Sequence, residues 1–229
     1  MPNPPFIIFA DARTGSTTLA DVLRDFTGQL VSEPFNGRHG SFGRTEAGVK
    51  HLLQWLVDRN AGAKHLSAHL NLPNNALLLG DRRARIIFLQ RRNVLQQAVS
   101  WLLSAGADDW HDPARAAEAA RRTTLDILKL HHLISGILGR RAVFGSICAR
   151  RDNVLAVNYE DIYYHHAQET LNEMLAFLDL PPVEANNPGL LKITEGERVT
   201  PIDTYRLIQN INEVDAIFSG DVLGRLFEK

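Results

Sequence analysis

Residues 6–19 read FIIFADARTGSTTL. Residues 6–10 are apolar throughout, which is typical of a strand buried on both faces of a sheet, and residues 17–26 continue in a helical pattern. The polar residues between them therefore join a buried strand directly to a helix. A strand, a short polar turn and a helix in this order are the opening unit of an α/β fold.

The same alternation continues along the chain. Residues 85–90 and 154–158 are further short apolar runs, residues 64–69 are a weaker one, and residues 77–79 fit a strand or a helix. Helical patterns lie between the strands, at 17–26, 45–59, 94–104, 114–138, 167–178 and 203–218. Asp112-Pro113 is a typical start for the long helix, and Gly139 is its expected stop.

These patterns predict one domain over residues 1–229. We expect an α/β fold of the P-loop-like, three-layer kind, with a central parallel sheet flanked by helices on both faces. Residues 181–229 fit the alternation less well and are expected to form an irregular C-terminal segment.

Composition and charge exclude several classes of protein. Apolar residues make up 45% of the chain and charged residues 22%, which excludes wholesale disorder. A net charge of −1 argues against a nucleic-acid partner, and no apolar run approaches the about 20 residues of a membrane helix. The one cysteine excludes an intramolecular disulfide. Since no signal peptide is recognisable, we expect a cytoplasmic protein without membrane insertion; a homo-oligomer is compatible with the sequence.

The turn after the first strand has the chemistry of a phosphate site. Gly15 lets the backbone approach a ligand, the helix start offers N–H groups and a positive dipole end, and Arg13 adds a charge. The turn is not a Walker A loop, because Ala10 stands where the first glycine belongs and Ser16 where the lysine belongs. Capping of the helix by these hydroxyl residues is the competing interpretation.

Residues 6–19 resemble the 5′-phosphosulfate loop of sulfotransferases that use 3′-phosphoadenosine-5′-phosphosulfate (PAPS), most closely in the bacterial carbohydrate sulfotransferases. The resemblance implies that the loop at residues 10–19 holds the 5′-phosphate and the sulfonate. The matching residues are Arg13, Thr14, Gly15, Ser16, Thr17 and Thr18.

A second match is at residues 85–101, which resemble the 3′-phosphate segment of the same family. An apolar strand runs into Arg92 and Asn93, and Ser100 follows eight residues after the arginine. Ser100 lies two helical turns beyond Asn93, so its hydroxyl and the Arg92 guanidinium can share one anion. A solvated arginine and a serine bonded to its own helix backbone are the alternative.

Two later segments match more loosely. Residues 158–162, NYEDI, resemble a Tyr-Glu-Asp motif that we expect to cap a helix and tie neighbouring loops together. Many sulfotransferases close a basic C-terminal loop over the nucleotide, and Lys192 and Arg198 are the candidates here. The Arg-Lys-Gly signature of the cytosolic members is missing at that place.

The resemblance implies transfer of a sulfonate from PAPS to an acceptor hydroxyl or amine on a small molecule or glycan, with PAP as product and no metal. Arg13 would stabilise the leaving phosphate, while Ser16 and Thr17 would orient it. The base that accepts the hydroxyl proton is left open between Glu33, which follows the first helix, His69 or His65, and a residue that is none of these. Two other functions also stay open, a P-loop-type nucleotide kinase and a non-catalytic module that binds a nucleotide or anion.

Overall fold

The computed structural model describes residues 4–105, 112–196 and 202–228. The chain divides into two compact units, which we call the first unit (Met1–Gln90 with Ala142–Glu195) and the second unit (Arg91–Arg141 with Gly196–Lys229). That residues 1–229 form a single domain stays a prediction.

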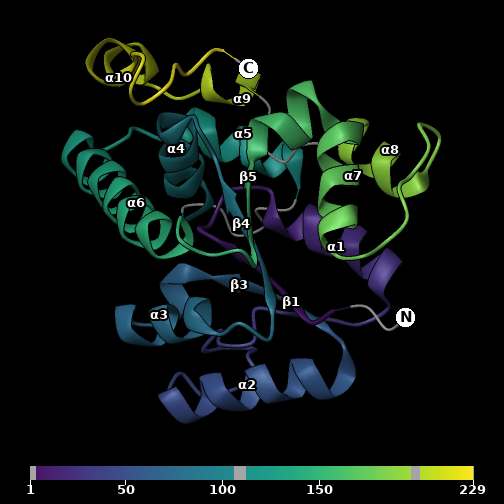
Figure 1. The fold of residues 1–229 in the computed structure, drawn as a ribbon. Helices are drawn as coiled ribbons and strands as arrows, with labels where there is room; N and C mark the ends of the chain where they lie inside the picture. Colours follow the sequence, from purple (N-terminus) through teal and green to yellow (C-terminus); the bar gives the residue numbers. More distant parts are fainter. Residues whose placement is uncertain (1–3, 106–111, 197–201, 229) are drawn as a thin grey trace. The chain divides into compact units, whose positions relative to one another are not determined.

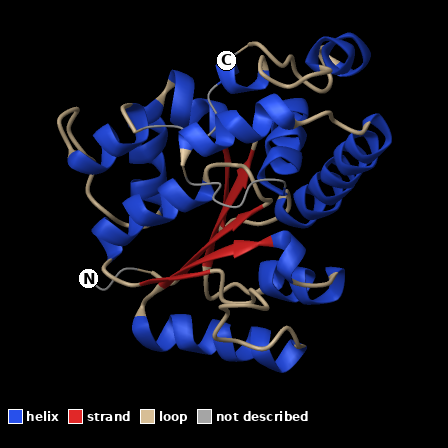
Figure 2. Cartoon of the chain, turned by 180° about the vertical axis from the view of Figure 1, so that it is seen from behind, coloured by secondary structure: helices blue, strands red, loops and turns tan. Residues whose placement is uncertain are grey.

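The first unit is built on a parallel sheet, as the sequence predicts. Among the described residues the sheet has five strands, in the order β2-β3-β1-β4-β5. Figure 2 shows these strands as arrows that point the same way. Their bounds are β1 Phe6–Ala10, β2 Leu30–Ser32, β3 Gly62–Leu66, β4 Arg85–Gln90 and β5 Val154–Asn158. β2 was not predicted, because it has three residues and none of them is fully buried.

Helices of the first unit cover both faces of this sheet (Figure 1). Phe6, Ile8 and Ala10 of β1 pack with α1 (Ser16–Thr27), α7 (Ala167–Phe177) and α8 (Pro188–Thr194). Ile7 and Phe9 face the other way, toward α2 (Glu46–Arg59), α3 (Leu72–Gly80) and the last turns of α6 (Ile127–Cys148). Burial on both faces explains the unbroken apolar run, since each fully buried Phe or Ile contributes about 1.5–3 kcal/mol.

The order of the strands identifies the edge of the sheet where a ligand is expected. From β1 the chain moves to β2 and β3 on one side, and then crosses to β4 and β5 on the other. The order therefore reverses next to β1, and α/β folds bind ligands beyond the carboxyl ends of the strands at such a switch point. Residues 11–15, Glu33 and Ser67 all follow the carboxyl ends of strands.

The helix predicted over residues 114–138 is wrong in its extent. Asp112 caps a first helix, α5 (Pro113–Arg122), and α6 starts separately at Ile127 and passes through Gly139 to Cys148. The break has a partner in the second unit: Asn210 accepts from the Leu125 N–H at 2.8 Å and donates to its carbonyl at 2.9 Å. These side-chain bonds replace the helical ones, and packing of α6 outweighs the about 1 kcal/mol cost of an internal glycine.

Other boundaries differ in smaller ways. The strand predicted at residues 64–69 ends at Leu66 and continues as a 3₁₀ turn, η1 (Ser67–His69), while residues 77–79 lie in α3. The C-terminal segment expected to be irregular contains α8, α9 (Ile202–Tyr205) and α10 (Ile211–Phe218), so the helix predicted over 203–218 is two short ones. The remaining elements are α4 (Val94–Ala105) and a π-helix, η2 (Asp161–His165). No helix in the described ranges is long and apolar enough to cross a membrane.

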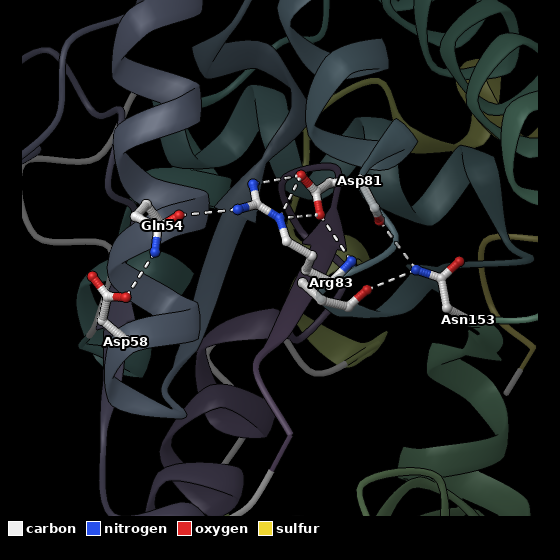
Figure 3. A network of polar contacts seen from close by, with 6 residues as sticks. Gln54, Asp58, Asp81, Arg83 and Asn153 are labelled. Atoms are coloured by element: carbon white, nitrogen blue, oxygen red, sulfur yellow. Dashed lines mark hydrogen bonds and ion pairs between the residues drawn. The ribbon is translucent and has the colours of Figure 1, made fainter.

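A polar network holds the amino-terminal edge of the sheet together (Figure 3). The Asp81 carboxylate accepts from the Arg83 guanidinium at 2.8 Å, and Arg83 also donates to Gln54 of α2 at 3.0 Å. Asn153, just before β5, donates to the carbonyls of Asp81 and Ala84. These bonds join α2 to the segments that lead into β4 and β5, so the network has a structural role at this edge.

Candidate active site

The turn between β1 and α1 is fixed by a residue from a distant segment. Gly15 adopts a left-handed conformation with φ 75° at the start of α1, and its carbonyl accepts from the Tyr163 hydroxyl at 2.7 Å. A Cβ at Gly15 would lie 2.5 Å from a carbon of the Tyr163 ring, so no other residue fits there. Arg13 also has a positive φ, 67°, a conformation that costs a non-glycine residue about 1–3 kcal/mol.

The hydroxyl residues of the turn have different environments. Thr14 is buried and donates to the Asp11 carbonyl at 2.9 Å, which makes it part of the turn itself. Ser16 is buried, Thr18 is half-buried and Thr17 is exposed. The first turn of α1 contains no acidic residue and no side chain caps it. Its N–H groups and the positive end of the helix dipole are therefore suited to an anion.

A buried ion pair lies next to this turn. Lys64 of β3 is 3% exposed, and its ammonium donates to the Glu33 carboxylate at 2.6 Å and to the Thr17 hydroxyl at 3.0 Å. The Glu33 N–H also donates to the Lys64 carbonyl at 2.8 Å, which continues the pairing of β2 with β3 beyond Ser32. Lys64 thus connects the turn between β1 and α1, which we call the phosphate-type turn, to Glu33, the carboxylate predicted as a base.

Glu33 is ionised at neutral pH. Its second oxygen accepts from the Asn36 amide at 2.7 Å. Burial raises the pKa of this carboxyl, but the hydrogen bonds of Lys64 and Asn36 and the charges of Lys64 and His69 outweigh burial, so the pKa lies below 4.5. A carboxylate with a lowered pKa and both oxygens engaged is a weak proton acceptor.

His69 completes the cluster from η1. Its Nε2 is 3.9 Å from a Glu33 oxygen, a distance longer than a hydrogen bond, and the side chain is 17% exposed. Burial lowers the pKa of His69, Glu33 raises it, and Arg44 and Lys64 lower it, with a net pKa below 6.5. At neutral pH the imidazole is therefore uncharged and can take up a proton.

His65, the other predicted histidine, is in the core. Its ring is fully buried against Phe9 and Phe35, and its Nε2 is 2.8 Å from the Asn75 amide oxygen. Burial lowers the pKa of His65 to about 4. The Asn75 amide also donates to the Ser67 and Leu70 carbonyls, so this pair holds η1, which carries His69.

The segment predicted to bind the 3′-phosphate begins with β4 in the first unit, while its Arg92, Asn93 and Ser100 belong to the second unit. Arg92 is exposed, whereas the neighbouring Arg91 is buried and donates to Gln96 at 2.7 Å. Asn93 accepts from the Gln96 N–H at 2.9 Å and so caps α4, on which Ser100 is buried. The predicted Arg-Asn turn and helix are therefore present.

Only one of the two C-terminal lid candidates lies in the described part of the chain. Lys192 is exposed on α8 of the first unit, and Arg198 lies outside the described residues. In the second unit the tail contacts α4: the Gln96 amide donates to the carbonyls of Arg225, Leu226 and Glu228. This contact was not predicted, since nothing in the tail sequence marks its carbonyls as partners.

One surface pocket, of about 480 Å³, lies at the opposite edge of the sheet, where β4 and β5 begin. Arg85 in its wall is already paired with Asp179 at 2.7 Å.

Within the described ranges no group of three or more His, Cys, Asp or Glu side chains is placed to hold a metal ion. The candidate active site is thus the carboxyl edge, around Gly15, Glu33, Lys64 and His69.

The residue that sequence reasoning missed is Lys64. Its signal was present, because a lysine inside an otherwise buried strand requires a partner to compensate its charge. The identity of that partner was not readable, since Glu33 is 31 residues away in the chain.

A turn whose N–H groups suit an anion therefore lies beside an ion pair and an uncharged imidazole. No protein-family model matches the chain, and no curated protein matches its sequence.

Three solved structures that resemble the chain are sulfotransferases, each with 15% sequence identity. One is mouse sulfotransferase SULT7A1 complexed with PAP, with a TM-score of 0.48 over 99% of this chain and 74% of that one. Another is the sulfotransferase domain of the Synechococcus PCC 7002 olefin synthase, with a TM-score of 0.43 over 96% and 90% of the two chains. The third is the sulfotransferase domain from the curacin biosynthetic pathway, at 0.39 over 88% and 82%.

Proposed function

We propose that the protein is a PAPS-dependent sulfotransferase of the bacterial carbohydrate type, acting in the cytoplasm on a hydroxyl or amine of a small molecule or glycan. The observation that carries the proposal is the position of Lys64. Its ammonium bonds both to Thr17 of the phosphate-type turn and to Glu33 beside His69. A donor site and a proton acceptor are thereby held next to each other.

The residues of the turn fit the phosphosulfate end of PAPS. The free N–H groups at the start of α1, the close approach allowed by Gly15 and the charge of Arg13 supply donors and one cation for a phosphate oxygen. PAPS, when bound, supplies a sulfonate attached to a phosphate leaving group. Arg92 and Ser100 would hold its 3′-phosphate, with Lys192 and Arg198 as further contacts.

The environments of Glu33 and His69 support different roles for the two. His69 is the base: the acceptor hydroxyl gives its proton to Nε2 as its oxygen bonds to sulfur, and the bond from sulfur to the phosphate oxygen breaks to release PAP. Glu33 stabilises the imidazolium that forms and holds Lys64 in place. His65 positions η1 through Asn75 and does not take part in proton transfer.

Binding of PAP tests the donor site. We expect PAP at about 100 times its dissociation constant to stabilise the fold by about 2.7 kcal/mol, because it binds the folded chain alone. A thermal scan with PAP, and with magnesium-ATP as the comparison, measures this. No shift with millimolar PAP together with a shift with magnesium-ATP would replace the sulfotransferase by the kinase.

The Arg92→Ala variant tests the 3′-phosphate segment. Loss of one charge-assisted bond is expected to weaken PAP binding by roughly 1.5–3 kcal/mol. Adenosine 5′-phosphosulfate lacks the 3′-phosphate, so its affinity should stay nearly constant in the same calorimetric titration. Equal losses for both ligands would instead assign Arg92 to the support of the fold.

A further inference from the structure

The loop that follows Glu33 carries an unusual charge distribution. Residues 34–45, PFNGRHGSFGRT, contain two arginines and one histidine but no aspartate or glutamate, in a chain whose net charge is −1. This loop leads from the carboxyl end of β2 to the start of α2, so it borders the site on the side of Glu33.

The loop is organised by its own hydrogen bonds. The Asn36 N–H donates to the Glu33 carbonyl at 2.9 Å, and the Phe42 N–H donates to the Pro34 carbonyl at 3.0 Å. Phe35 is fully buried and packs edge-on against the His65 ring. A loop anchored in this way presents its charged side chains from a fixed backbone, as a binding surface requires.

Arg44 is the most constrained of the charged residues in the loop. Its Nε donates to the Phe35 carbonyl at 2.9 Å, and its own carbonyl accepts from the Asn74 amide at 2.9 Å. The guanidinium lies against the backbone of Gly37, where a Cβ would be 2.5 Å from the Arg44 Nη2. Within the described ranges no carboxylate lies within ion-pair distance of Arg44, so its charge is uncompensated.

The positive charge of the loop lies beside the residues that are proposed to face the acceptor. Glu33 is the nearest acidic residue in the chain before the loop, and its charge is already paired with Lys64. Arg44 is bonded to the Phe35 carbonyl, the Phe35 ring packs on His65, and the His65 and His69 ring centroids are 6.3 Å apart. The charge of Arg44 also lowers the pKa of the His69 imidazole. The loop beside the proposed base therefore carries a guanidinium that the Phe35 carbonyl holds in place and that makes no ion pair within the described ranges.

We propose that the acceptor is itself an anion, a hydroxyl compound whose carboxylate binds the Arg44 guanidinium while its hydroxyl faces His69. A planar guanidinium is matched to a carboxylate, which it can bind through two parallel hydrogen bonds. This inference rests on the proposed function, since it names the class of its acceptor.

The test uses acids and their isosteric amides. 4-Hydroxybenzoate is compared with 4-hydroxybenzamide, and D-glucuronate with D-glucuronamide, by calorimetric titration into the protein with and without saturating PAP. In at least one pair the acid is expected to bind about 10-fold tighter than the amide, because its bonds to Arg44 are charge-assisted. Arg44→Gln should remove this preference. Arg59→Gln, which changes an exposed arginine of α2 outside the loop, should keep it.

The remaining outcomes either overturn the inference or show that the proposed function fails while the anion site is real. No acid preference in either pair, or a preference that survives Arg44→Gln, overturns the inference. A loss of PAP affinity in Arg44→Gln, with the preference intact, places Arg44 in the donor site and also overturns it. If PAP does not bind, while the free protein shows a preference that depends on Arg44, the anion site stands and the sulfotransferase does not.

Discussion

Turnover is expected to fall by about 10²–10⁴-fold in His69→Asn, because removing a positioned general base costs this much. The affinity for PAP should stay nearly unchanged, since the proposed mechanism assigns His69 to the acceptor and the turn at residues 13–18 to the donor. Asparagine keeps a planar polar group of similar reach but cannot take up the proton. Steady-state rates, together with calorimetry on PAP, give the two quantities.

The Glu33→Gln variant tests whether Glu33 or His69 is the base. If Glu33 is the base, as its place after the first helix also allows, this variant shows the larger loss and His69→Asn keeps most of its activity. If His69 is the base, the acid limb of the pH–rate profile follows the His69 pKa. That pKa should then fall in Glu33→Gln and rise in Arg44→Gln, because Glu33 raises it and Arg44 lowers it. Imidazole NMR reads the same shifts without turnover.

The sheet was predictable because its strands are buried on both faces. In β1, adjacent residues face opposite helix layers, so every position is apolar and the run is recognisable in isolation. β2 has only three partly exposed residues and is specified by its pairing with β3, which local sequence does not encode.

Helix ends were less predictable wherever a distant side chain sets them. Asp112 was recognised as a cap because it lies next to the helix that it caps. The break at Leu125 depends on Asn210, which is 85 residues away, so the continuous helical pattern was misleading.

In the candidate site, too, local features were predictable and contacts between distant residues were not. The turn at residues 13–18 is local, and its glycine and hydroxyl residues are recognisable from their order. The links from Lys64 to Glu33 and from Tyr163 to Gly15 arise from parallel pairing and packing, at separations of 31 and 148 residues. Sequence therefore identified the turn and Glu33, but neither Lys64 nor the ion pair that it forms with Glu33.

That ion pair is expected to be essential to the fold of the site. Lys64→Met should lower the free energy of unfolding by about 3 kcal/mol, because it leaves the Glu33 carboxylate without its cation. The value lies at the low end of the range for broken buried pairs, since Glu33 is 25% exposed and retains some contact with water. Urea denaturation of the two proteins at neutral pH measures the difference.

The double variant Glu33→Gln/Lys64→Met shows why Lys64→Met lowers the free energy of unfolding. If most of it is the unpaired carboxylate, removing the charge of Glu33 as well should recover a large part of the lost stability, and the two changes should be strongly non-additive. Lowering the pH toward the Glu33 pKa should narrow the gap between Lys64→Met and the unaltered chain, because protonation neutralises the same carboxyl. Additive losses would mean that Lys64 stabilises β3 by packing, and Lys64 would then no longer connect the donor turn to the proton acceptor.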